Sequence, residues 1–597
     1  MNYQHYISFN GSDFTEITIE QPQLETQKGE YAFYRTECND LRILQKLNSS
    51  VYSTLNTWFT DDTKFSTEIS YEIYRGTRAT GTLMYQGFFS ISDAQMDKDN
   101  GVFRVKPQID DTYRDIMNLV DTDFTMQPAL FGVTNLIYSR TCVIKDAWTA
   151  AAGRTTFNTF TATAGTISSF IATDTNDRGN SAQLDGGVSL VSGYRVLVEV
   201  SAVSDNPYID IEDTSGNSIT AGGQEITATG IYVFVINADQ PAEICVYNNS
   251  TTLDGSITFT VRIGEKTVSN SCDTFMNVIE NYLSSALYMN LTGFSGNVKS
   301  TFINNDALPT GAPSSISSWM TTNPDGNYAS EVTASNELND FCITMTENWV
   351  GADPAGFERS FTQFMEDLFN TIRAKWFIDA DGDFRIEHEK YFEKQWEDST
   401  ALDVTGILDQ KRELEFDKSL LANREQFSWA QAENEDFIGE DIIYDNLETI
   451  GNTKKYTVGN VTTDMKYLVD NQDDASGSGY CFVIANAITG YREIQVSEGL
   501  LSGGQISNAA MSWANLHDSY WKWERMSENG DMNDGDTISF ESAVKFLKIK
   551  NVKFPYTSDI DGFTKVTVED GTGQQEVTVR DLRTDFVEME LMFNPYA

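Results

Sequence analysis

Histidine is scarce in this chain of 597 residues, and its scarcity limits the chemistry that the chain can perform. The three histidines are His5, His388 and His517, so histidine-dependent nucleophilic or metal chemistry would need two of them to meet in the fold. We expect each to be a packing or surface residue instead. The sequence also lacks a G-x-S-x-G elbow, a phosphate-binding P-loop and an H-E-x-x-H zinc motif. These absences predict a protein that is not an enzyme and that holds no cofactor or metal ion.

Closely spaced cysteines are missing as well. The six cysteines are far apart in the chain, at Cys38, Cys142, Cys245, Cys272, Cys342 and Cys481. No C-x-x-C pair occurs, so the sequence gives no support to a zinc ribbon or to thioredoxin-like chemistry. We expect reduced, buried thiols.

Long apolar runs are absent, including from the amino terminus. The first residues, MNYQHYISFNGSDF, have neither the charged segment nor the apolar segment of an export signal. No run approaches the roughly 18 apolar residues of a membrane-spanning helix. The sequence therefore predicts a chain made and assembled in a cytoplasm, without membrane insertion.

Basic residues are few relative to acidic ones. The chain has 42 Lys and Arg residues against 88 Asp and Glu residues, a formal net charge of −46. Such a surface repels phosphate groups, which argues against specific nucleic-acid binding and against binding to anionic membranes. Three explanations stay open: solubility, a salty habitat, or a wall that does not retain a passing polyanion.

Proline is rare, with 11 residues against 41 glycines, and 12% of the residues are aromatic. Together with abundant Asn, Thr and Ser, this composition is typical of strands and turns. We predict a mainly β (α+β) chain of several β-rich domains, of barrel or sandwich type, with a few amphipathic helices. The predicted domains are an N-terminal β-rich domain (1–145), an inserted β-sandwich (146–268), a helix-containing α+β domain (269–400) and a C-terminal β-rich domain with one aromatic helix (401–597).

The segment before residue 146 alternates apolar and polar residues. In FSTEISYEIYRG the apolar positions are Phe65, Ile69, Tyr71 and Ile73, the period-two pattern of a half-buried strand. Asn100-Gly101 predicts a hairpin turn further on.

Charge decreases between about residues 146 and 268. The stretches SGYRVLVEVSAV, NPYIDIED, GIYVFVINAD, AEICVYNNS and GSITFTVRIG are short β-branched strands at nearly regular spacing, which favours an inserted sandwich or jelly roll. Aromatic side chains on such a sandwich can stack on sugars. The candidate glycan contacts are Tyr194, Tyr208, Tyr232 and Tyr247, and the alternative is a sandwich that serves only as a scaffold.

Three stretches have helical periodicity. The first carries Phe275, Met276, Ile279, Leu283 and Leu287 on one face, with Asp273 placed to cap its start. The second has an apolar face of Phe361, Phe364, Met365, Leu368 and Ile372, behind a capping box of Ser360 and Gln363. The third places Trp513, Leu516, Tyr520 and Trp523 at helical steps, as a core or interface face or as a sugar platform.

The most acidic short window is AKWFIDADGDFRIEHEKYF, residues 374–392. Counted from Asp379, glycine is fourth and Lys390 is twelfth, whereas a calcium loop of the EF-hand type needs glycine sixth and glutamate twelfth. Glu387 and Glu389 fall on one face of a predicted strand and could be read as paired catalytic carboxylates. We predict instead a hairpin with its turn at Asp379–Asp383, with Arg385 and Tyr391 sharing a solvated face with both glutamates and Phe384, Ile386 and Phe392 facing a core.

An ordered series of segments resembles a group of tail structural proteins from bacteriophages of Bacteroidota hosts. The series is GFFSISDAQMDKDNGVFRVKPQIDDTY, MEDLFNTIRAKWFIDADGDFRIEHEKYF, ANREQFSWAQAENEDFIGEDIIYD, TTDMKYLV, GYCFVIANA, LSGGQISNAAMSWANLHDSYWKWERMSENGDMN and SAVKFLKIKNVKFP. The resemblance covers most of residues 1–145 and about 272–597 and omits the sandwich. It brings no catalytic motif and so transfers no functional residue.

The resemblance implies a virion component at a tail hub, baseplate or adaptor. Such a protein would assemble with copies of itself as a ring, trimer or hexamer, contact other tail proteins and contribute to the path of DNA ejection. Two alternatives stay open. One is a fibre-like adhesin that attaches to host surface glycans through the sandwich, and the other is a polysaccharide depolymerase that uses Glu387 and Glu389.

Overall fold

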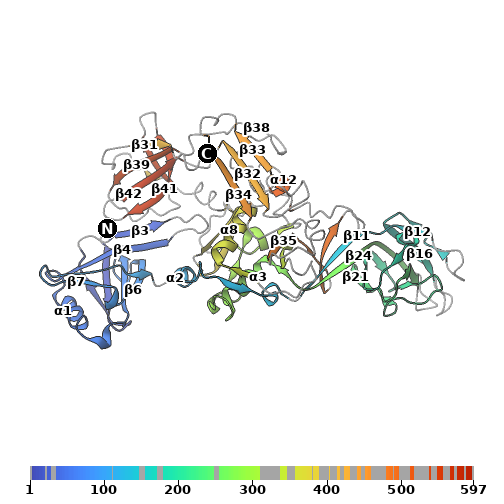
Figure 1. The fold of residues 1–597 in the computed structure, drawn as a ribbon, viewed down its shortest axis with the longest axis horizontal. Helices are drawn as coiled ribbons and strands as arrows, with labels where there is room; N and C mark the ends of the chain where they lie inside the picture. The colour runs from blue at the N-terminus through green and yellow to red at the C-terminus, as the bar shows by residue number, and fades with distance from the viewer. Residues whose placement is uncertain are drawn as a thin grey trace.

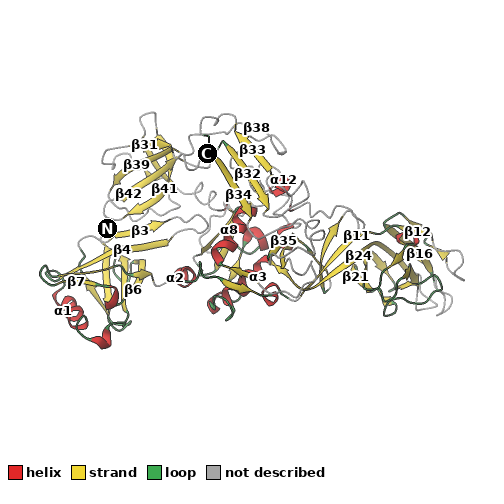
Figure 2. Cartoon of the chain, viewed as in Figure 1, coloured by secondary structure: helices red, strands yellow, loops and turns green. Residues whose placement is uncertain are grey.

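The computed structural model describes most of the first 309 residues and separate segments of the remainder. The described residues are 3–19, 23–27, 35–109, 112–132, 134–146, 155–170, 179–247, 255–309, 337–345, 357–379, 381–388, 391, 402–403, 413–416, 423–429, 440–444, 451–458, 479–488, 490–496, 511, 513–516, 537–538, 547–554, 565–569, 574–583 and 587–593. Strands dominate these residues and helices are few (Figure 2). The predicted mainly β fold is confirmed. Within the described ranges no sheet closes into a barrel; the β-rich parts of the chain are open sheets and a sandwich.

An antiparallel sheet opens the chain, with α1 (Ser49–Trp58) beside it. Its order is β2 (Phe14–Ile17), β1 (Tyr3–Ser8), β5 (Ile69–Arg75), β6 (Thr82–Phe89) and β9 (Gln108–Ile109). Ile69, Tyr71 and Ile73 are fully buried, as their alternation predicted. The prediction for Phe65 was wrong. It follows the turn η1 (Asp62–Lys64), ahead of the strand, and 59% of its surface is exposed.

A second sheet joins the two ends of the chain. Asn100 and Gly101 turn β7 (Gln95–Asp97) into β8 (Val102–Val105), with Gly101 at φ +63°, as predicted. This hairpin pairs with β4 (Arg35–Leu44), which pairs with β3 (Gln23–Gln27). β3 then pairs with β41 (Gln574–Arg583), so N-terminal blue and C-terminal red strands lie together in Figure 1. The C-terminal strands of this sheet are β30 (Leu402–Asp403), β31 (Glu413–Phe416), β39 (Leu547–Phe554), β40 (Lys565–Glu569) and β42 (Val587–Phe593).

The predicted sandwich is present. One layer contains β14 (Thr159–Phe160), β15 (Ala164–Phe170), β24 (Gly255–Thr274), β18 (Arg195–Ser204) and β21 (Gly230–Val235). The other contains β12 (Ile144–Asp146), β13 (Thr155–Thr156), β16 (Asn180–Leu184), β23 (Glu243–Tyr247), β19 (Tyr208–Glu212) and β20 (Gln224–Glu225). A shared apolar core lies between them, with Val196, Val198, Ile209, Ile211 and Ile244 fully buried. The short pair β17 (Ser189–Leu190) and β22 (Gln240–Pro241) completes it.

The sandwich is joined to the rest of the molecule through the 20-residue strand β24. Its first part pairs with β15 and β18, and its later part pairs with β11 (Thr134–Thr141). β11 in turn pairs in parallel with β37 (Tyr491–Val496), which pairs with β36 (Asn486–Ile488). The predicted domain boundary at residue 268 therefore lies inside a continuous strand.

The largest core surrounds α3 (Phe275–Ser284) and α8 (Phe361–Ile372) in the middle of the view in Figure 1. The capping box of Ser360 and Gln363 forms, and all five predicted apolar residues of α8 are buried. For α3 the N-cap is Thr274 rather than Asp273, because the Thr274 side chain accepts from the Asn277 amide. Leu287 lies beyond the end of α3 and is 70% exposed, so its assignment to the apolar face was wrong.

The remaining elements pack around this core or beside it. They are α2 (Thr112–Met117), β10 (Phe124–Met126), β25 (Val298–Lys299), α4 (Thr301–Asn304), β26 (Phe341–Met345), β27 (Phe357–Arg359), β28 (Ala374–Ile378), β29 (Phe384–His388), β32 (Arg424–Trp429), β33 (Glu440–Tyr444), β34 (Thr453–Val458), β35 (Tyr480–Ile484), α12 (Trp513–Leu516) and β38 (Thr537–Ile538). Short 3-10 turns occur at η2 (Ile91–Asp93), η3 (Pro128–Phe131), η4 (Asp185–Gly187), η5 (Thr292–Phe294) and η6 (Glu337–Asp340).

Candidate functional site

The acidic window is a hairpin, as predicted. β28 and β29 pair antiparallel, with Ile378 opposite Phe384. Asp379 Oδ1 accepts from the amides of Asp381 and Asp383, each at 3.0 Å, and Gly382 takes φ +85°. The carboxylate of Asp379 thus fastens the turn.

The prediction of a solvated charge ladder on β29 was wrong. Arg385 and Glu387 are buried, 2% and 0% exposed. The Arg385 guanidinium lies 3.0 Å from Asp379 Oδ2 and 2.9 Å from Glu387 Oε1. The ladder failed because α4 and the segment after it cover this face: Arg385 also donates to Thr301 Oγ1 and to the carbonyl of Ala307.

Glu387 is held from the other side by backbone. The amides of Thr301 and Phe302, which begin α4, donate to its two carboxylate oxygens at 2.8 and 3.1 Å. Burial raises the pKa of Glu387, while Arg385 and the two amides act in the opposite direction. Both oxygens are engaged in internal bonds, an arrangement typical of a structural ion pair. Glu389, Lys390 and Phe392 lie outside the described residues, and Tyr391 is buried.

The histidines and thiols that fall in the described part of the chain are packing residues. His5 is stacked against Tyr71, with Nδ1 2.8 Å from the Tyr71 hydroxyl, and His388 packs on Phe302. Burial lowers the pKa of His5 to about 4. All six cysteines are buried free thiols, as predicted, whereas His517 lies outside the described residues.

Among the described residues, no group of three or more His, Cys, Asp or Glu side chains has the spacing to hold a metal ion. No described helix combines the length and the apolar character that crossing a bilayer requires.

The four candidate tyrosines do not form one site. Tyr208 and Tyr247 are directly opposite each other on β19 and β23, with their rings stacked at 5.7 Å. The Tyr247 hydroxyl lies so close to Gly223 that an added Cβ would come within 2.1 Å of it. Burial, together with the nearby carboxylates of Asp210 and Glu212, raises the pKa of Tyr247 to about 12. Their strand neighbours Ile209 and Val246 face the shared core, so this half-buried pair lies on the opposite face of the second layer.

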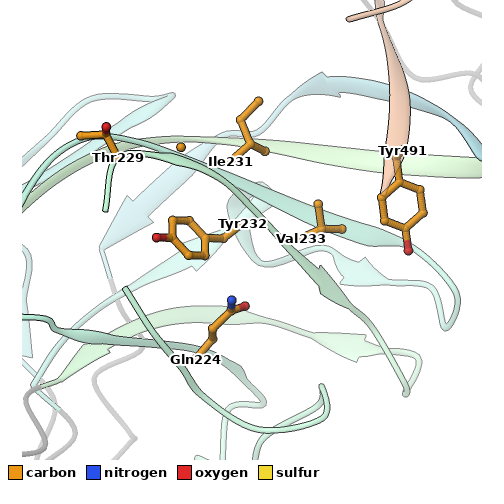
Figure 3. A pocket seen from close by; sticks show the side chains of 7 residues that line it. Gln224, Thr229, Ile231, Tyr232, Val233 and Tyr491 are labelled. Atoms are coloured by element: carbon orange, nitrogen blue, oxygen red, sulfur yellow. The ribbon is translucent and has the colours of Figure 1, made fainter. Parts of the chain in front are cut away.

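Tyr194 and Tyr232 lie on the other layer. Tyr194 packs against the sandwich core ahead of β18. Tyr232 belongs to β21, and its hydroxyl donates to the carbonyl of Ala228 at 2.9 Å. Of the four, only Tyr232 lines the hollow shown in Figure 3.

That hollow has a volume of about 370 Å³ and follows the edge of the sandwich. Its walls come from β20, from β21 and the residue before it, and from β37; they are Gln224, Thr229, Gly230, Ile231, Tyr232, Val233 and Tyr491. Sequence reasoning found Tyr232 but missed Gln224 and Tyr491. No local signal marks either residue, because Tyr491 reaches the site only through the pairing of β37 with β11.

The aromatic helix is described only in part. Trp513 and Leu516 on α12 are buried, and Trp513 lies 5.0 Å from Trp429 and 5.6 Å from Phe427 between ring centroids. The core interpretation is confirmed for these two residues. Tyr520 and Trp523 lie outside the described residues.

Comparisons with known proteins give only slight likenesses. No family model matches the chain, and no curated protein matches it. A tail protein from Neisseria meningitidis MC58 superposes on 68% of this chain and 99% of its own, with 10% identity and a TM-score of 0.19. One chain from the structure of the phage P2 baseplate in its activated conformation with Ca matches over 76% of this chain and 98% of its own length, with 9% identity and a TM-score of 0.14. TM-scores this low do not establish a common fold.

Proposed function

We propose that the chain is a structural protein of a bacteriophage tail, of hub, baseplate or adaptor type, and that it acts without catalysis. The ordered series of segments quoted above first suggests this role. In the structure, the observation that best supports it is β24, which continues without a break from the sandwich into the central core. A force applied to the sandwich passes into the core along hydrogen-bonded strands, which suits a part that holds other parts in place.

The ion pairs of the acidic hairpin support the same role. Asp379, Arg385 and Glu387 bind one another and the start of α4, so they stabilise the scaffold. A depolymerase that used Glu387 would need at least one carboxylate oxygen directed at a substrate. The test is to measure polysaccharide cleavage by the wild type and by Glu387→Gln. The non-catalytic role would be overturned if the wild type cleaved a polysaccharide and the variant, still folded, did not.

The acidic charge suits a wall of the DNA exit path. A lumen rich in Asp and Glu lets a polyanion pass without binding it. In an assembled ring we expect acidic side chains toward the channel, and a channel lined by Lys and Arg would contradict this part of the proposal.

Particle shape and location test the role. We expect negative-stain images of the purified chain to show closed rings, and antibodies against it to label the tails of intact particles. A thin elongated trimer would favour a fibre, and absence from purified virions would overturn the proposal.

A second candidate function is attachment to host surface glycans. The hollow beside Tyr232 favours it, because an aromatic ring, an amide and a hydroxyl meet there at the edge of the sandwich. A glycan array probed with the full-length chain tests it, and a silent array removes it.

A further inference from the structure

The hollow beside β21 combines walls from two distant parts of the chain. Gln224, Thr229 and Tyr232 belong to the sandwich, whereas Tyr491 begins β37 in the sheet shared with the central core. β21 is the outermost strand of its layer among the described strands, since it pairs only with β18. The site therefore lies at an open edge of the sandwich, where a ligand can enter (Figure 3).

The walls have the chemistry of a sugar site. Tyr232, Tyr491, Ile231 and Val233 offer aromatic and aliphatic surface to the C–H face of a pyranose ring. The Gln224 amide and the Thr229 hydroxyl can each donate to and accept from sugar hydroxyl groups. The volume of about 370 Å³ is at the lower end of the range of about 300–1,000 Å³ for small-molecule sites, which suits one or two sugar residues.

Contacts hold both rings in place. The Tyr232 hydroxyl donates to the Ala228 carbonyl and accepts from the Ala228 amide, at 2.9 and 3.3 Å. The guanidinium of Arg195 lies 6.0 Å from the centroid of the Tyr491 ring, at the outer limit of a cation–π contact. The Tyr232 ring, fixed by two hydrogen bonds, loses little freedom when a ligand binds.

The ligand should be uncharged. None of the seven lining residues is ionisable near neutral pH, although the chain has a net charge of −46. A cation would find no carboxylate in the walls, and an anionic sugar would be repelled by the protein as a whole. Two charged residues near the walls have partners of their own: Glu199 is paired with Arg262 at 2.6 Å, and Arg195 donates to the carbonyl of Gly193.

We infer that the hollow beside β21 is a binding subsite for a residue of a neutral glycan and that Tyr491 forms one of its walls. The inference rests on the second candidate function and adds to it the sugar class and a wall outside the sandwich. Because Tyr491 comes from β37, the excised segment 146–268 lacks part of the site.

The test uses the full-length chain on an array of neutral and anionic oligosaccharides, followed by calorimetric titration of the best neutral glycan. Tyr491→Ala and Gln224→Ala should each weaken binding, the first by about tenfold, as expected for loss of a buried aromatic contact. Tyr491→Phe, which keeps the ring, should stay within about threefold of wild type. Gln224 is exposed, so its variant should fold even if Tyr491→Ala does not.

Val188→Ala is the control, since it shortens an exposed apolar side chain of the same sandwich that does not line the hollow, and it should bind as wild type does. Binding that is lost in Val188→Ala and kept in Tyr491→Ala would overturn the inference. Equal binding of anionic and neutral glycans would also overturn it. So would an array that shows no binding of neutral glycans, which is the result expected if the natural ligand is a peptide strand that pairs with β21. None of these results bears on labelling of the tail, so failure here is distinguishable from failure of the structural role.

Discussion

At the scale of single residues, the most informative side chain is Arg385. It is a buried cation that pairs with two buried carboxylates, Asp379 and Glu387, and its remaining donors reach Thr301 and Ala307. A buried charge that loses its partner keeps its desolvation cost without compensation. The three groups therefore depend on one another inside the core.

Replacing Glu387 by Gln tests this dependence. We expect the variant to lower the free energy of unfolding by about 1–3 kcal/mol, because the NH2 group of Gln cannot accept the hydrogen bonds that Arg385 and the amides of Thr301 and Phe302 donate to Glu387. Chemical denaturation of both proteins measures the difference. Glu68→Gln, at an exposed position, is the matched control and should change stability by no more than about 0.5 kcal/mol. Equal effects of the two substitutions would contradict the buried ion pair.

His5 gives a pH-dependent prediction. Burial against Tyr71 lowers its folded-state pKa to about 4, from the unfolded value of 6.5. The folded chain then binds fewer protons than the unfolded chain between these values. The contribution of His5 to stability is complete above pH 6.5 and is lost as the pH falls toward 4, by about 3 kcal/mol in all.

Histidine-selective NMR measures the titration directly, because the chain has only three histidines. The His5 ring should stay neutral at pH 5.5 and titrate near pH 4. Disappearance of its signals in His5→Asn assigns them. A midpoint at pH 6.5 or above would show that His5 is not buried against Tyr71.

At the scale of elements, helix faces and caps follow from local sequence. The start of α8 was predicted from Ser360 and Gln363 because both partners of a capping box lie within one turn. The end of α3 was not predicted correctly, because Leu287 continues the helical spacing although the helix ends at Ser284. Periodicity indicates which residues share a face and does not say how far the helix runs.

Ser360→Ala should remove one of the two capping bonds of α8. We expect a loss of about 1 kcal/mol in unfolding free energy, the usual worth of an N-cap side chain. Thermal unfolding of the full-length chain measures it. Ser53→Ala, on the exposed face of α1, has no cap to lose and should change stability by at most about 0.5 kcal/mol. A neutral Ser360→Ala would mean that α8 is held by its apolar face alone.

At the scale of the whole molecule, the connection between sandwich and core depends on Gly264. At Gly264, β24 pairs with β18 on one side and with β11 on the other. Gly264 lies opposite Arg195 of β18 and opposite Ser139 of β11. A Cβ at Gly264 would lie 2.6 Å from Ile137 Cγ2 and 3.2 Å from Leu197 Cδ1. Both neighbours are buried, so the three strands approach closely only because this residue has no side chain.

Gly264→Val should separate these strands. We expect a loss of about 1–3 kcal/mol in stability from overpacking, with faster proteolysis near the junction. Limited proteolysis followed by mass spectrometry measures the second effect. Gly293→Ala is the control, because a Cβ there meets nothing within 4 Å. A proteolysis pattern unchanged by Gly264→Val would contradict the close approach.

The sequence by itself determined the β-rich class, five of the sandwich strands (β18, β19, β21, β23 and β24), the 379–383 turn and the apolar face of α8. Each of these follows from neighbours a few positions apart, through side-chain alternation, turn residues and caps. It also gave one of the tyrosines that line the hollow.

Only the tertiary structure decided the burial of Glu387, the unbroken path of β24 and the wall formed by Tyr491. The amides that donate to Glu387 belong to residues 85 and 86 positions earlier in the chain. Tyr491 reaches the hollow beside β21 because its strand, β37, pairs with β11. Alternation shows that Arg385 and Glu387 share a face, but whether water or another segment covers that face depends on long-range packing, which local spacing does not encode.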